Sequence, residues 1–213
     1  MQLTIDIVSD LICPWCFIGK RRLEKALADF PTQLAPKITW KPFQLNPDMP
    51  KDGMNRRAYR EAKFGSWEAS QRLDARVAEA GAGEGIEFSF DNTERTPNTL
   101  DAHRLIWLAQ RRNVQDSIVE RLFKDYFVRG KDIGRGDILL SAGVGCGLDE
   151  KDVAGFLESA DGLAEITDEE QTMRRLGITS VPNFILNSEF SVSGAQEPRV
   201  FISAITQVLS YKG

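Results

Sequence analysis

The chain has 213 residues, a length that fits one domain or one domain with a large insertion. Hydrophobic residues make up 42% and charged residues 27%, which excludes disorder for most of the chain. The net charge of −4 gives no basic footprint for nucleic acid, and no apolar run approaches the ~20 residues of a membrane helix. The first residues lack the pattern of a secretory leader, so we expect a cytoplasmic protein without membrane or nucleic-acid partners.

The first 45 residues predict a strand, a helix and a second strand. Apolar and polar residues alternate over 3–8, which is typical of a strand. A helix is expected to start at Cys13-Pro14, because proline is favoured at the first helical position, and to run to about Phe30. A second strand is expected over 37–43. This order favours a parallel β-α-β unit with a right-handed crossover.

The middle of the chain is predicted to be helical from about Met54 to Gly177. Asn98 and Asp149 are the expected N-caps of two of its helices, and the apolar stretch 86–90 is a candidate for an extended segment.

The end of the chain returns to strands. A hairpin is predicted around the turn residues Asn187-Ser188, followed by a last helix from about Glu197. Residues 1–47 and 178–213 together supply enough elements for one small α/β domain, which neither segment can form alone. We therefore predict a discontinuous α/β domain with an α-helical domain, residues 48–177, inserted into it.

The chain has three cysteines, of which Cys13 and Cys16 form a Cys-x-x-Cys pair and Cys146 stands alone. This is too few for a disulfide scaffold, and with a single histidine, His103, a structural zinc site is disfavoured. We predict no metal site. The close pair in a cytosolic protein instead indicates redox chemistry.

The position of the pair on the first helix suggests a role for each thiol. Cys13 is expected at the exposed N-terminal end of the helix, where unpaired backbone N–H groups and the helix dipole favour a thiolate. Cys16 is expected one turn further along, on the buried seam, from which it can resolve a mixed disulfide. Pro14 stiffens the turn between them, and Trp15 adds bulk without charge. The basic run 20–22 is interpreted as a solvated face.

Taken together, these features resemble the DsbA branch of the thioredoxin superfamily. The resemblance rests on the strand–Cys-Pro-Trp-Cys–helix–strand order, the helical insertion, and Ser180-Val181-Pro182 before the hairpin. Several stretches resemble its FrnE-like members: 8–10, 13–20, 98–99, 102–105 and 194–196.

The resemblance implies a thioredoxin fold with a large α-helical insertion that caps the active site. It also implies a cis peptide between Val181 and Pro182, opposite Cys13, with backbone groups free to pair with an extended substrate. Strongly oxidising members carry histidine where this chain has Trp15, so we expect a weaker oxidant.

Two further residues are candidates for the cleft. His103 is read first as a core residue and, as the alternative, as a residue lining the active-site cleft, whereas Asp10 is expected to orient the loop before Cys13. Cys146 is read as a small buried thiol.

The function predicted from these observations is that of a thiol–disulfide oxidoreductase acting on protein or small-molecule thiols. It needs no bound cofactor beyond the Cys13–Cys16 dithiol, which is expected to couple to glutathione or a thioredoxin system. The alternative is a glutathione-dependent enzyme of the kappa-type transferase and hydroxychromene-carboxylate isomerase group, whose members have serine at the position of Cys13. A third reading is a chaperone-like peptide-binding module beside Val181.

Overall fold

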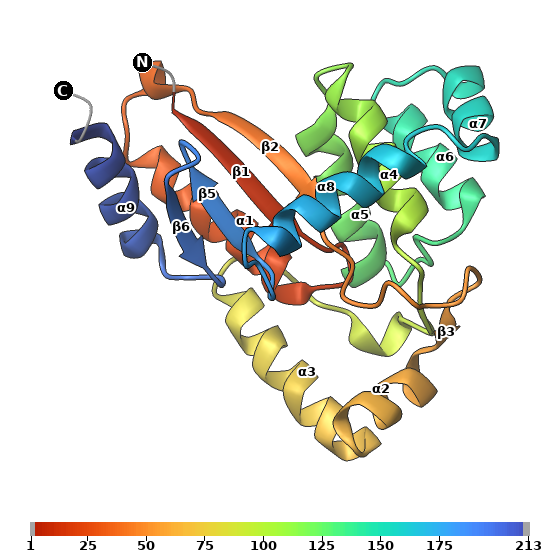
Figure 1. Ribbon diagram of the computed structural model, residues 1–213. Helices are drawn as coiled ribbons and strands as arrows, with labels where there is room; N and C mark the ends of the chain where they lie inside the picture. Colours follow the sequence, from red (N-terminus) through yellow and green to blue (C-terminus); the bar gives the residue numbers. More distant parts are fainter. Residues whose placement is uncertain (1–2, 211–213) are drawn as a thin grey trace.

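A four-stranded sheet forms the centre of the molecule in a computed structural model that describes residues 3–210. Its strands run in the order β2-β1-β5-β6 (Figure 1): β1 (Thr4–Ser9), β2 (Lys37–Pro42), β5 (Asn183–Leu186) and β6 (Phe190–Ser193). β1 is parallel to β2 and antiparallel to β5, and β6 is antiparallel to β5. Segments from the two ends of the chain therefore share one sheet, as the predicted α/β fold class requires.

The helix between the parallel strands, α1 (Pro14–Ala28), begins and packs as the sequence predicts. Cys13 is its N-cap and Pro14 its first residue. Gly19 allows α1 to lie directly on the start of β5, because a Cβ at this position would come within 3.0 Å of Phe184 and 3.1 Å of Pro182. This contact places the N-terminus of α1 next to the loop before β5.

The C-terminal hairpin and helix complete this part of the fold. Asn187 and Ser188 both have positive φ angles, 48° and 60°, as a tight hairpin turn requires. The last helix, α9 (Pro198–Ser210), packs against α1 and β6. Its Phe201 ring lies 4.7 Å from the ring of Phe184 in an edge-to-face contact.

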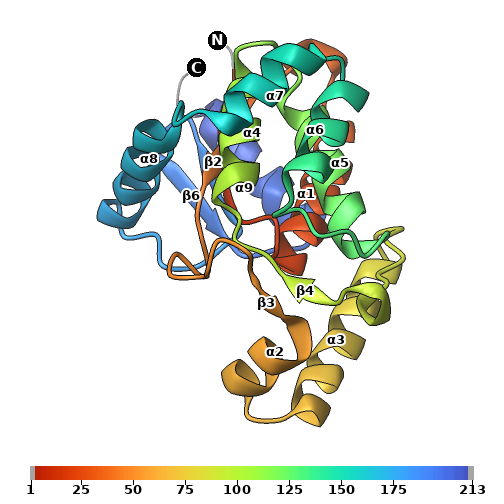
Figure 2. The same ribbon diagram turned by 90° about the vertical axis from the view of Figure 1, so that its right-hand side faces the viewer.

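Most elements between β2 and β5 are helices. They are α2 (Arg56–Phe64), α3 (Trp67–Ala82), α4 (Leu100–Gln110), α5 (Gln115–Phe127), α6 (Gly136–Gly145), α7 (Glu150–Glu158) and α8 (Leu163–Arg175). A short 3-10 helix, Phe90–Asn92, and a small antiparallel ladder of β3 (Met54–Asn55) and β4 (Arg95–Thr96) complete this set, and a second 3-10 helix, Thr32–Leu34, lies between α1 and β2. Figures 1 and 2 show α2 and α3 as a hairpin that projects away from the other helices.

Some local predictions for this region are confirmed and others are not. The Asp149 side chain caps α7 by accepting from the N–H groups of residues 151 and 152. Asn98 lies one residue before the N-cap of α4 but still accepts from the Leu100 N–H at 2.9 Å. The stretch 86–90 is not a strand; it leaves α3 as an irregular segment and enters a short 3-10 helix.

One hydrophobic core spans the sheet and the inserted helices. Phe17 of α1 stacks on Phe123 of α5, with ring centroids 5.1 Å apart, and Trp40 of β2 meets Phe123 edge to face. Val77 of α3 and Leu105 of α4 belong to the same cluster of buried side chains. The helical insertion thus shares one hydrophobic core with the α/β layer.

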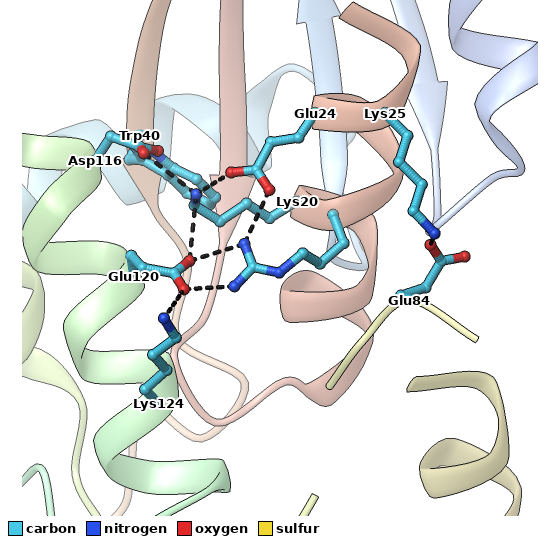
Figure 3. Close-up of polar contacts among 9 residues, drawn as sticks. Lys20, Glu24, Lys25, Trp40, Glu84, Asp116, Glu120 and Lys124 are labelled. Atoms are coloured by element: carbon cyan, nitrogen blue, oxygen red, sulfur yellow. Dashed lines mark hydrogen bonds and ion pairs between the residues drawn. The ribbon is translucent and has the colours of Figure 1, made fainter. Parts of the chain in front are cut away.

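An ion-pair network reinforces the junction of α1 and α5 (Figure 3). The interpretation of residues 20–22 as a solvated face is wrong, because the side chains of Lys20, Arg21 and Arg22 are only 5%, 20% and 14% exposed. The Lys20 ammonium group lies 3.2 Å from Asp116 and 3.3 Å from Glu120, both on α5, and also pairs with Glu24. Arg21 bonds Glu120 as well. The periodicity of α1 could not reveal the partners on α5, because Asp116 and Glu120 lie about 100 positions away in the sequence.

We expect Glu120→Gln to lower the free energy of unfolding by about 1–2 kcal/mol at pH 7, allowing for solvent screening. Burial raises the pKa of Glu120, but hydrogen bonds from Arg21 and Lys124 and the charge of Lys20 outweigh burial and lower the pKa to about 2. This stabilisation is complete above the unfolded pKa of about 4.3 and is lost as the pH falls toward 2.

Urea denaturation at several pH values measures this effect. Glu87→Gln is the matched control, because Glu87 is exposed and has no ion pair among residues 3–210. A stability difference between wild type and Glu120→Gln that stays constant from pH 7 to about pH 2.5 would contradict the assignment.

Candidate active site

Cys13 lies at the junction between β1 and α1, at the N-terminal end of the helix. Its N–H donates to the carbonyl of Asp10 at 3.0 Å, which closes a tight turn, and Pro14 then starts the helix. The N-terminus of a helix favours a thiolate because its first N–H groups lack partners and the dipole is positive there. The expectation that Cys13 is exposed is wrong, since only 5% of the residue is accessible.

The loop before β5 explains this burial. The Cys13 thiol donates to the carbonyl oxygen of Val181 at 3.6 Å. The Val181–Pro182 peptide bond is cis, and the Pro182 carbonyl accepts from the Gly194 N–H at 2.8 Å. Val181 thus covers Cys13 from a segment 168 residues further along the chain.

Cys16 lies one turn into α1 and is 1% exposed. Its N–H donates to the Cys13 carbonyl at 3.0 Å, and both cysteines are free thiols. Burial raises the pKa of Cys16 well above its ordinary value, and the neighbouring Cys13 raises it further, while the Ser9 side chain and the Asp10 backbone act in the opposite direction. Cys16 is therefore a neutral thiol at pH 7, close to Cys13 and shielded from water.

Two buried polar residues, Asp10 and His103, lie close to each other near the start of α1. Asp10 is 0% exposed, and its carboxylate accepts from the Leu45 N–H at 2.7 Å, which ties the loop after β2 to the loop before α1. His103 of α4 is 4% exposed, and its Nε2 lies 3.6 Å from an Asp10 oxygen. This Nε2 has no hydrogen-bond partner among residues 3–210 and borders a cavity of about 10 Å³ that Ser9 also lines. The structure brings Asp10 and His103 together, and neither lines the large pocket beside Cys13 that is described below.

Comparison with known proteins assigns the chain to a family. Residues 4–206 match the family described as DSBA-like thioredoxin domains. The chain belongs to this family. It is also 32% identical to a probable DsbA oxidoreductase from Streptomyces coelicolor, covering 98% of this chain and 91% of that one, with a TM-score of 0.90. The DsbA-like fold of a thioredoxin domain with a helical insertion is thereby confirmed.

Two more distant solved structures share the DsbA-like fold. The cytosolic disulfide reductase DsbM from Pseudomonas aeruginosa, solved with GSH, has a TM-score of 0.68 at 18% identity, covering 97% of this chain and 99% of that one. A 2-hydroxychromene-2-carboxylate isomerase has a TM-score of 0.70 at 14% identity, covering 98% and 97%. At these identities the likeness concerns the fold alone.

In this DsbA-like protein a pocket of about 440 Å³ opens beside Cys13. The N-terminal turn of α1 forms one wall, and the α2–α3 hairpin and α5 form the others. Trp15 lies on its rim with 40% of the residue exposed. Tyr59 and Phe64 of α2 also line the pocket. Cys13 is thus buried from bulk solvent but reachable through this pocket.

Four basic residues that line the pocket were not predicted from the sequence: Arg56, Arg60 and Lys63 of α2 and Arg76 of α3. The three on α2 are spaced four and three apart, which places them on one face of a helix. That spacing is visible in the sequence, but nothing in it indicates that this face turns toward Cys13.

The remaining sequence candidates lie elsewhere. Cys146 is the half-buried C-cap of α6, and burial raises its pKa. Within residues 3–210, no cluster of three or more histidine, cysteine, aspartate or glutamate side chains is placed to bind a metal ion. In the same part of the chain, no helix has both the length and the apolar character needed to cross a bilayer.

Proposed function

We propose that this protein is a thiol–disulfide oxidoreductase whose reacting groups are Cys13 and Cys16. The observation that carries the proposal is the pairing of a cysteine at the N-terminus of α1, facing a pocket, with a buried cysteine one turn behind it. Pro14, Trp15, Val181 and Pro182 surround the pair and support its geometry.

The exchange would proceed in two balanced steps. The Cys13 thiolate attacks one sulfur of a partner disulfide, a bond forms to that sulfur, and the other partner sulfur leaves as a thiolate. Cys16 then loses its proton and attacks Cys13, and the first partner sulfur leaves. The partner disulfide has gained two electrons and becomes two thiols, and the protein has lost two electrons and holds a Cys13–Cys16 disulfide. The reverse sequence oxidises a partner.

The direction proposed for the cell is reduction or isomerisation of disulfides in the cytoplasm. A reducing cytosol keeps such a pair mostly reduced unless its potential is low. Trp15 adds no positive charge beside Cys13, which is consistent with a weak oxidant. The proposed electron donors are glutathione or a thioredoxin system, and the proposed partners are protein or small-molecule thiols and disulfides of the kind handled by FrnE-like proteins.

Trp15 fluorescence across a series of glutathione redox buffers at pH 7, checked by thiol trapping, tests the proposal. We expect a reversible two-electron transition, because Trp15 lies between Cys13 and Cys16 in the sequence and lines the same pocket as Cys13. Trp15→Phe is the control that removes this signal and leaves the other three tryptophans. The midpoint of the wild-type transition indicates whether the protein reduces or oxidises disulfides in the cell.

A pair that stays in one state across all buffers would contradict the proposal. If glutathione then bound without oxidising or reducing the pair, the glutathione-dependent transferase or isomerase would become the leading function. The pocket beside Cys13 is the observation that favours this second candidate, since such an enzyme needs room for a second substrate.

A further inference from the structure

The charges that line the pocket beside Cys13 are not balanced. Arg56 and Arg60 share the carboxylate of Asp74, each at 2.5 Å, and Asp74 is the one acidic residue of the lining. Among residues 3–210, Lys63 contacts only neutral groups, including the Tyr59 hydroxyl at 2.6 Å and an Asn46 oxygen at 3.5 Å. Four cations therefore face one anion.

Arg76 adds to the imbalance. It lines the pocket from α3 and has no hydrogen-bond or ion-pair partner among residues 3–210. Burial lowers the pKa of Arg60, and the nearby charge of Arg56 lowers it further against the opposing effect of Asp74. Like charges held together in a half-enclosed space repel one another, and a bound anion relieves that repulsion.

The rest of the pocket wall is apolar. Trp15, Leu45 and Leu73 are among the few large apolar side chains exposed in the described part of the chain, and all three line this pocket. The aromatic rings of Phe64 and Phe90 add to the wall. A volume of about 440 Å³ lies within the roughly 300–1,000 Å³ typical of small-molecule sites.

We propose that this pocket is a subsite for a low-molecular-weight thiol or disulfide that carries a carboxylate and an apolar body of about ring size. The carboxylate is held by Lys63 and Arg76, the ring lies against the apolar wall, and the sulfur reaches Cys13 at the pocket's inner end. This substrate class rests on the proposed function, because it assigns the partner of the same dithiol.

The first test compares two aromatic disulfides as oxidants of the reduced protein in stopped flow. Dithiobis-nitrobenzoate carries two carboxylates, and dithiodipyridine carries none. We expect the rate constant for dithiobis-nitrobenzoate, divided by that for dithiodipyridine, to fall about tenfold in a Lys63→Gln, Arg76→Gln double variant. Two charges that attract the anion are lost in this variant. The same ratio is expected to fall with added salt in the wild type.

Lys151→Gln is the matched control. Lys151 is an exposed lysine of α7, on the far side of the molecule from α2 and α3 (Figure 1), and its substitution removes a charge without touching the pocket. Its rate ratio is expected to stay within about twofold of the wild-type value. An equal fall in the control and the double variant, or no fall in either, overturns the subsite.

The second test needs no redox chemistry. In a Cys13→Ser, Cys16→Ser variant, we expect naphthoate to quench Trp15 fluorescence saturably, and the uncharged naphthalene methanol to bind at least about fivefold more weakly. Equal binding of the two probes, or no binding, overturns the proposal. This variant cannot exchange disulfides, so probe binding tests the subsite independently of the oxidoreductase proposal. If only the oxidoreductase proposal fails, the probes still bind with the expected preference. If only the subsite fails, disulfide exchange remains but the preference for the carboxylate is lost.

Discussion

A Cys16→Ala variant is expected to stop with its partner covalently attached to Cys13. Cys16 is buried one turn behind Cys13 and is the thiol placed to displace a partner from it. Without that thiol, the first exchange still forms a mixed disulfide, but the second step has no nucleophile. We expect turnover with a disulfide substrate to fall by at least about a thousandfold, and mass spectrometry of the unreduced protein to show one bound partner.

Two further variants make this result specific. Cys13→Ala is expected to abolish both turnover and the adduct, since it removes the thiol that faces the pocket. Cys146→Ala is the control, because this half-buried cysteine at the end of α6 lies outside the site and its loss should leave turnover intact. Near wild-type turnover by Cys16→Ala with glutathione present would contradict a two-cysteine mechanism and favour a transferase that needs one reacting position.

The sequence was sufficient to predict the elements that hold the two cysteines. Alternation over 3–8 and the proline after Cys13 locate β1 and the start of α1 to within a residue, because both signals are local. The hairpin at Asn187-Ser188 follows from residues that tolerate positive φ. These features are determined by residues that are close together in the chain, so a single sequence is enough to predict them.

What surrounds the cysteines depends on long-range contacts and could not be predicted. Cys13 is covered by Val181 from the far end of the chain, and the pocket that reaches it is formed by the α2–α3 hairpin. Lys20 looks like a surface residue in its own helix, yet carboxylates of α5 surround it. Helical periodicity gives the face of a residue but not which partner packs against that face.

His103 is another residue whose long-range contact could not be predicted from the sequence. A lone histidine on an apolar helix face is usually a satisfied core residue, and His103 is indeed buried. Its Nε2, however, has no hydrogen-bond partner among residues 3–210 and lies beside Asp10, which comes from the loop before α1. The apolar neighbours of His103 on α4 therefore do not predict the Asp10 carboxylate that lies beside its ring.

The release of a partner from Cys13 is expected to accelerate with pH, by about tenfold per unit between pH 6 and pH 8. The attacking group is the Cys16 thiolate, and burial is the largest of the causes that raise the pKa of Cys16 well above its ordinary value. In the mixed disulfide Cys13 is uncharged, so its own contribution to that rise disappears, but burial remains. The thiolate fraction then grows in proportion to hydroxide throughout the interval.

Ser9→Ala tests whether this pKa governs the step. The Ser9 side chain lowers the pKa of Cys16, and its oxygen has no hydrogen-bond partner among residues 3–210, so the substitution removes little else. We expect the variant to release a chromophoric thiol from a preformed Cys13 adduct more slowly at every pH, with the same slope. A release rate independent of pH in the wild type would show instead that a buried base takes the proton, and the Asp10–His103 pair behind the cysteines would be the group to replace next.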